Sequence, residues 1–138
     1  MRPLLEEHGR MAWEFAWAFT GRSDAAASCL ALAFRELESS PPPSQEPARR
    51  RAVWRALVDA CRRQVTGRPP GSPESGDARL AALLALPLEL RETILLFRYH
   101  GASAEDLGAT LGCSPPAAMS RAQRALTRLA LSRAVPGP

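Results

Sequence analysis

The last part of the chain has a row of arginines at helical spacing. Arg121, Arg124 and Arg128 recur at intervals of three and four residues, so on a helix they share one face. No acidic residue follows Asp106, so nothing nearby in the sequence offsets this charge. Each guanidinium of such a row can neutralise one phosphate of a nucleic acid. The same spacing is also typical of a solvated face on a bundle helix, and the residues alone leave both interpretations open.

The segment just before this row is almost without polar side chains. Residues 115–119 are Pro-Pro-Ala-Ala-Met. These side chains offer no bidentate hydrogen bond to a base edge, so direct readout of DNA would depend on Ser120, Arg121 and apolar contacts to thymine methyl groups. Arg124 and Arg128 lie farther along and suit phosphates, which position a protein without specifying a sequence. The pattern predicts a DNA-binding frame with reduced sequence readout.

Other kinds of site have little support in the sequence. The three cysteines, Cys29, Cys61 and Cys113, form no CxxC pair, and neither histidine lies near them in the sequence. We therefore predict buried free thiols, with neither a metal site nor a disulfide framework. There is no glycine-rich phosphate loop and no nucleophile paired with a base. An enzyme is thus the least supported class, and no cofactor is expected.

Composition and charge favour a small helical protein with a nucleic-acid partner. All 18 basic residues of the 138-residue chain are arginine, and residues 47–68 hold seven of them against one aspartate. Such basic zones raise the expectation of nucleic-acid binding. We find no signal-peptide pattern and no apolar run of the ~20 residues that a membrane span requires. The sequence predicts a cytoplasmic protein without membrane insertion.

Seven helices and no strand are predicted. Alanine and leucine dominate and aromatic residues make up only 6% of the chain, which favours helices. Ser23, Ser103 and Ser114 are predicted N-caps, and Pro115 suits the first position of the last helix. The predicted helices span 5–19, 25–38, 48–65, 78–86 and 88–100, followed by a short helix from Ser103 to Leu111 and a last helix from Pro115 onward.

Apolar residues at helical spacing predict which faces are buried. Trp13, Trp17 and Trp54 are interpreted as core or interface residues rather than as stacking platforms for bases. The predicted buried faces hold Met11, Phe15, Ala18 and Phe19 in the first helix and Ala118, Ala122, Ala125, Leu126 and Leu129 in the last.

The helices are predicted to form two small domains. Residues 67–77 are rich in proline, glycine and serine, a composition typical of a linker. We therefore expect one helical domain over residues 1–66 and a second over residues 78–138. Within the second domain, the short break around Gly112 predicts a helix-turn-helix.

A distinctive motif spans most of the second domain. It reads LPxxxRExxLLFRYHGASxxDLGxxLGCS over residues 86–114, followed by SRAQRALTRL over residues 120–129. This motif resembles the C-terminal domain, region 4, of group IV (extracytoplasmic-function) sigma factors, and the likeness covers nearly all of residues 78–130. In that family, the domain docks its helix-turn-helix into the upstream promoter element. The resemblance implies contacts with promoter DNA at Ser114, Ala117, Met119, Ser120, Arg121, Arg124 and Arg128.

The first domain resembles region 2 of the same family more weakly. The points of contact are Phe-Thr-Gly at residues 19–21, Phe34 and Trp54. Where the family has an Asp-Leu-Val-Gln-type patch that grips the polymerase clamp, this chain has Ser-Cys-Leu-Ala at residues 28–31. The acidic and amide groups of the patch are therefore absent. The resemblance implies contacts with core RNA polymerase at Ser28, Cys29, Leu30, Ala31 and Phe34.

Two hypotheses for function follow. The first is a divergent, non-enzymatic sigma-like transcription factor that binds promoter DNA and core RNA polymerase, with an anti-sigma or other regulatory protein as a further partner. The second is a sigma-like helical module that binds a regulatory protein and has little or no DNA binding.

Overall fold

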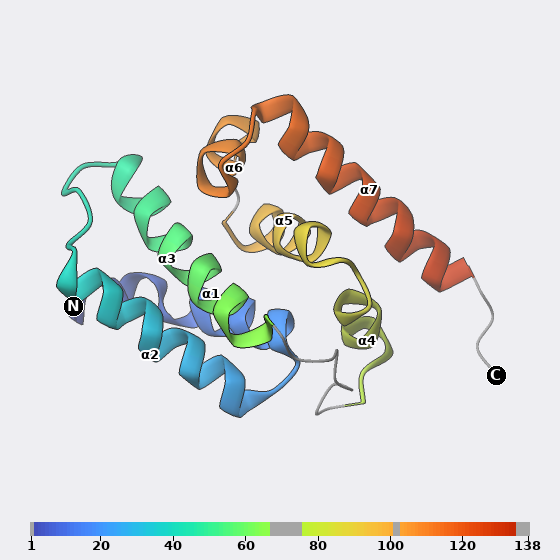
Figure 1. Cartoon of the computed structure of the whole chain (residues 1–138), viewed down its shortest axis with the longest axis horizontal. Helices are drawn as coiled ribbons and strands as arrows, with labels where there is room; N and C mark the ends of the chain where they lie inside the picture. Colours follow the sequence, from blue (N-terminus) through green and yellow to red (C-terminus); the bar gives the residue numbers. More distant parts are fainter. Residues whose placement is uncertain (1, 67–75, 101–102, 135–138) are drawn as a thin grey trace.

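The computed structural model describes residues 2–66, 76–100 and 103–134. Over these ranges the chain forms seven helices and no strand, which confirms the predicted all-helical class. The third and fifth helices have the predicted bounds, and the fourth ends at Leu84 rather than at Leu86, ahead of Pro87. The helices are α1 (Arg2–Thr20), α2 (Ser23–Ser39), α3 (Ala48–Val65), α4 (Ala78–Leu84), α5 (Leu88–His100), α6 (Ala104–Leu111) and α7 (Pro115–Ala134) (Figure 1).

The first three helices pack around an aromatic cluster. Phe15 of α1 meets the indole of Trp54 edge-on, with ring centroids 5.4 Å apart, and Phe19 lies one turn farther along α1. All three side chains are buried, with exposed fractions of 1% or less. A buried aromatic side chain removes a large apolar area from water, so these three rings stabilise the packing of α1 against α3.

The last four helices form a second group around leucines. α7 packs along α5 and α6, and Figure 1 shows it on the outer edge of the molecule. Leu95 and Leu96 of α5 and Leu107 of α6 are buried in the same cluster as Ala118 and Ala125 of α7. The small side chains of these two alanines allow α7 to approach its neighbours closely.

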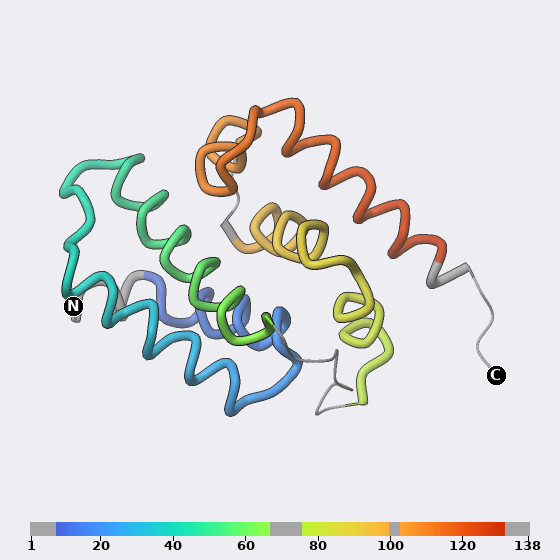
Figure 2. The backbone as a smooth tube through the Cα atoms, viewed as in Figure 1, coloured from blue at the N-terminus to red at the C-terminus, as the bar shows by residue number. Residues whose placement is uncertain are grey.

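The two groups of helices pack against each other. α1 contacts α4 and α5, and α3 contacts α5 and α6. One continuous cluster of buried residues runs through both groups, which lie side by side in Figure 2. Most of the predicted linker, 67–75, lies outside the described residues. The division into domains at 66 and 78 therefore stays a prediction, while the described residues share one core.

One predicted core residue of α1 is exposed. Met11 is 40% exposed, and the inward positions beside it are occupied by Ala12 and Ala16, which are 3% and 0% exposed. Because alanine side chains are small, these two positions let α1 lie close to its neighbours. The buried face of α1 is therefore centred on a side of the helix that does not include Met11. Trp13, interpreted as core or interface, is 38% exposed, so it is not a core residue.

Two further expectations are wrong in detail. Leu126 of α7 was assigned to the buried face and is 50% exposed, because Ala122 and Ala125 centre the contact with α5 and α6 on the adjacent side of the helix. Ser23 was assigned as an N-cap, but α2 already begins at Ser23. Arg22 occupies the cap position with extended backbone and without a side-chain capping bond.

Candidate nucleic-acid interface

The turn between α6 and α7 has the geometry of a helix-turn-helix. α6 is capped by Ser103, whose hydroxyl accepts a hydrogen bond from the Asp106 amide at 3.2 Å. The helix ends at Gly112, whose φ of 77° lies in the left-handed region that glycine adopts without strain. The amides of Gly112 and Cys113 both donate to the Gly108 carbonyl, at 2.8 and 2.9 Å. The chain is thereby turned sharply into α7.

Gly108 sets how closely the two helices approach. A Cβ atom at this position would lie 2.6 Å from the backbone carbonyl oxygen of Cys113. That separation is shorter than real contacts allow, so a side chain here would push the turn away from α6. The absence of a side chain at Gly108 thus permits the close approach, whereas its neighbour Ala109 is exposed.

The N-terminus of α7 is built as predicted. Ser114 accepts a hydrogen bond from the Ala117 amide at 3.3 Å, and Pro115 occupies the first helical position. Pro115 and Pro116 have no backbone N–H, and the amides of Ala117 and Ala118 donate to the hydroxyl and the carbonyl of Ser114, so this helix end offers no free amide to a phosphate. Ser114 is exposed, so its hydroxyl is accessible to a ligand.

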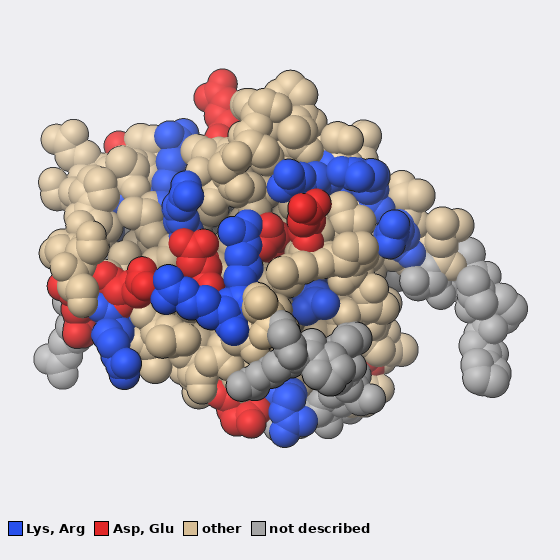
Figure 3. Space-filling view, in the orientation of Figure 1, with Lys and Arg blue, Asp and Glu red and all other residues tan. Residues whose placement is uncertain are grey.

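The residues predicted to contact DNA lie on the outer side of α7. Ser120, Arg124 and Arg128 are exposed, while Ala117, Met119 and Arg121 are half-buried. The opposite side, with Ala118, Ala122 and Ala125, is buried at 2% or less. Basic side chains follow α7 along the upper right of the molecule in Figure 3. The helix therefore presents a continuous basic surface without an acidic residue.

The predicted polymerase patch is only partly at the surface. Ser28 and Ala31 are exposed on α2, and Leu30 and Phe34 are half-buried. Cys29 is 0% exposed, so its side chain does not reach a partner from this position. It lies against Cys61 of α3, and burial raises the pKa of the Cys61 thiol well above its usual value. Both thiols are free and buried, as predicted, whereas Cys113 is free but only half-buried.

Three polar connections between the helix groups were not foreseen from the sequence. Arg62 of α3 donates two hydrogen bonds to the carboxylate of Glu92 in α5, at 2.7 and 2.6 Å. Glu92 is only 2% exposed, and its hydrogen bond raises the pKa of the Arg62 guanidinium. Arg51 of α3 pairs with Asp106 of α6 at 2.6 Å. The basic zone of α3 thus faces acidic residues of the second group.

The third connection is a buried arginine that binds backbone carbonyls. Arg91 donates to the carbonyl of Phe19, at the end of α1, at 3.0 Å. Its other donors reach the carbonyls of Leu84 and Leu86 at 2.9 and 3.3 Å. Burial lowers the pKa of Arg91 from its ordinary value. The sequence feature that could have indicated these connections is the Arg91-Glu92 pair of the region 4 motif. Both of its residues bind groups in the first three helices.

Comparison with known families agrees with this geometry. Residues 78–129 match the family model described as sigma-70, region 4. This part of the chain is sigma-factor-like. Sigma region 4 is a regulatory, DNA-binding domain associated with RNA polymerase and is not a catalytic family. The match covers α4 to α7 up to Leu129, including the whole helix-turn-helix. No curated protein and no solved structure matches the chain.

The described residues contain neither a metal-binding cluster nor a membrane-spanning helix. No group of three or more His, Cys, Asp or Glu side chains in these ranges could hold a metal ion. None of the described helices has the length and apolar character that crossing a bilayer demands.

Proposed function

We propose that the chain is a divergent group IV sigma factor that binds promoter DNA and core RNA polymerase in the cytoplasm. The observation that supports this most directly is the acid-free arginine face of α7, presented by a capped helix-turn-helix within the region 4 match. In this proposal residues 1–66 are a region 2-like domain, 67–77 a linker and 78–138 the region 4-like domain.

In this function, different residues of α7 contact the phosphates and the bases of DNA. Arg124 and Arg128 bind phosphates, and the exposed Ser114 hydroxyl donates a hydrogen bond to another phosphate oxygen. Ser120 and Arg121 reach base edges, where arginine can form two hydrogen bonds to a guanine.

The start of α7 adds only apolar contacts. Ala117 and Met119 contact thymine methyl groups, which discriminate bases less than hydrogen bonds do. Affinity for DNA in general is therefore expected to exceed sequence discrimination.

Polymerase binding in this proposal uses the exposed side of α2. Ser28 and Ala31 form the accessible surface, with Leu30 and Phe34 at its edge. The surface has no charge of its own at residues 28–31, so we expect weaker binding to the polymerase clamp than the family's acidic patch gives. An anti-sigma or other regulatory protein is a further proposed partner.

A titration of the full chain with labelled duplex DNA tests the function. Fluorescence anisotropy at several salt concentrations should show binding that weakens steeply as salt rises, because phosphate contacts release counterions. Co-purification with core RNA polymerase tests the second partner. Absence of DNA binding at low salt would overturn the DNA-binding part of the proposal.

A second candidate function is a sigma-like module that binds a regulatory protein and has little DNA binding. It is favoured by the partial exposure of Met11 and Trp13 on α1, at 40% and 38%, because methionine and tryptophan are enriched in protein interfaces. A pull-down from the native cell separates the two functions. Recovery of polymerase subunits supports the first, whereas recovery of another protein without polymerase and without DNA binding supports the second.

A further inference from the structure

A cavity of about 880 Å³ lies between α4, α5 and α7. This volume falls in the range of small-molecule sites in proteins, roughly 300–1,000 Å³. The cavity exists because alanines occupy lining positions on both sides, Ala78 and Ala82 on α4 and Ala130 on α7. α4 has only 7 residues against the 20 of α7, so it covers one part of the longer helix.

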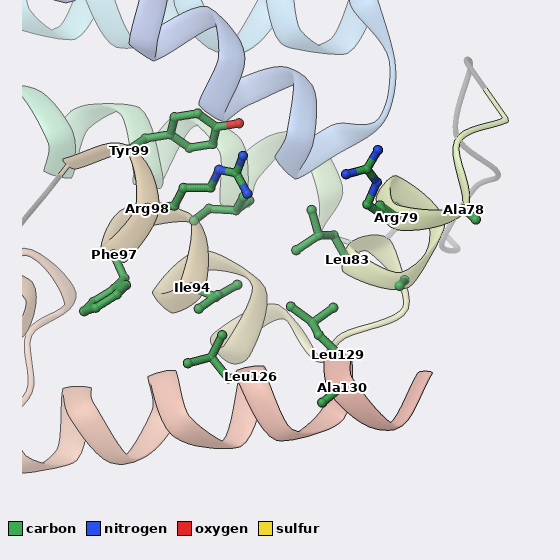
Figure 4. Close-up of a pocket in the computed structure, with 12 residues that line it drawn as sticks. Ala78, Arg79, Leu83, Ile94, Phe97, Arg98, Tyr99, Leu126, Leu129 and Ala130 are labelled. Atoms are coloured by element: carbon green, nitrogen blue, oxygen red, sulfur yellow. The ribbon is translucent and has the colours of Figure 1, made fainter. Parts of the chain in front are cut away.

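The lining of the cavity is polarised. Figure 4 shows Leu126 and Leu129 of α7 projecting toward Ile94 of α5 and forming an apolar side. The guanidinium groups of Arg79 and Arg98 lie on the side away from α7. No acidic residue among those that the structure describes lines the cavity, so these two positive charges have no carboxylate partner in that part of the lining. Arg98 also lies over the ring of Tyr99, 5.7 Å from its centroid.

We propose that this cavity binds a single-chain amphiphilic anion, of the class of long-chain alkyl carboxylates. The carboxylate binds the guanidinium groups of Arg79 and Arg98, since arginine forms short, charge-assisted hydrogen bonds to carboxylates. The alkyl chain lies between α5 and α7 against Ile94, Leu126 and Leu129. The partial exposure of Leu126, at 50%, then has a physical reason, because a bound chain covers it. The proposal requires neither DNA nor polymerase.

Calorimetric titration of the full chain with octanoate, decanoate and dodecanoate, each below its micelle concentration, tests the site. Each added methylene should lower the Kd about fourfold, which corresponds to the ~0.8 kcal/mol gained per buried methylene. The alcohol of the same chain length should bind about tenfold more weakly or worse, because it cannot form charge-assisted hydrogen bonds to the arginines.

Two pairs of variants locate the site. Ala130→Trp fills the cavity and should abolish binding, whereas Leu131→Trp, at the next position of α7 and outside the lining, should leave binding unchanged. Arg98→Gln should raise the Kd for the carboxylate about tenfold while leaving binding of the alcohol almost unchanged. Arg55→Gln, an exposed arginine of α3 far from the lining, is the matched control. Helical circular dichroism confirms that each variant is folded.

Three outcomes would overturn the proposal. The first is no binding of dodecanoate, and the second is binding with the same affinity at every chain length. The third is self-association of the ligand-free protein in sedimentation experiments that Ala130→Trp abolishes. In that case the groove would be an interface between two copies. None of these outcomes depends on DNA binding, so the failure of this proposal is distinguishable from failure of the proposed function.

Discussion

α3 and α7 both have several arginines, and the two helices use them differently. On α3, Arg51, Arg62 and Arg63 each form an ion pair with an acidic residue of another helix. On α7, Arg121 and Arg124 make no ion pair with any residue in the part of the chain that the structure describes. The residue type is the same in both helices. What differs is whether the fold brings carboxylates to them.

The difference separates a structural role from a binding role. An arginine that is paired with a buried carboxylate stabilises the fold, and its removal leaves an uncompensated charge in the interior. A solvated arginine contributes little to stability, yet its charge stays available for a polyanion such as DNA. Substitutions on α3 should therefore lower stability, and substitutions on α7 should lower DNA affinity.

The largest expected effect is from Arg62→Met. This change leaves the carboxylate of Glu92 buried at 2% exposure without its partner, which should lower the free energy of unfolding by about 3 kcal/mol. Urea unfolding followed by circular dichroism measures it. Arg63→Met is the matched control, since its partner Glu36 is exposed, and should cost about 0.5 kcal/mol. Equal losses of unfolding free energy in the two variants would mean that the Arg62–Glu92 pair stabilises the packing of the helix groups no more than an exposed ion pair does.

Gly108→Ala should disturb the position of α7 without touching its arginines. The added methyl group would meet the Cys113 carbonyl oxygen at 2.6 Å, so the turn must shift, and we expect a loss of about 2 kcal/mol in unfolding free energy. Gly9→Ala in α1, where nothing lies within 4 Å, should instead be neutral or stabilising by up to about 1 kcal/mol. A thermal melt compares the two variants. Equal melting temperatures for the two variants would mean that the turn before α7 has room for a side chain at position 108.

The arginine face of α7 should give the salt dependence of DNA binding. The three arginine charges of this face predict a log–log slope of about −3 for the binding constant against salt, and Arg124→Ala or Arg128→Ala should each reduce the slope by about 1 on every sequence. Arg121→Ala should cost about 1–3 kcal/mol on the preferred sequence only. Arg55→Ala on α3 is the control and should leave the slope unchanged. An unchanged slope in the α7 variants would place the DNA contact elsewhere.

The smallest expected effect concerns α2. Ser28→Asp together with Ala31→Gln restores polar groups at exposed positions of the predicted polymerase patch, and should tighten binding to core RNA polymerase by a few-fold, about 1 kcal/mol. Surface plasmon resonance with immobilised core enzyme measures the change. Asp24→Ser, which changes charge elsewhere on the same helix, is the control. A null result would assign this surface to another partner.

Local signals predicted the helices well and the buried faces less well. Ser103, Gly112 and Ser114 each act at the helix end where their chemistry places them, because capping depends on a few adjacent residues. Met11 and Leu126 were misplaced because which side of a helix is buried depends on its neighbours. In alanine-rich helices, apolar residues lie on several faces, so their periodicity distinguishes the buried face poorly. Packing against neighbouring helices determined which of two adjacent faces is buried.

The sequence by itself determined the all-helical class, the bounds of most helices, the helix-turn-helix and the presence of an acid-free basic face on the last helix. These features depend on propensity, capping and spacing within short segments. Only the tertiary structure decided that Arg62 pairs with Glu92, that Arg91 binds the carbonyl of Phe19, and that a cavity with two arginines opens between α4, α5 and α7. Each of these joins residues from different helices, and a contact between distant segments leaves no periodic trace in either one.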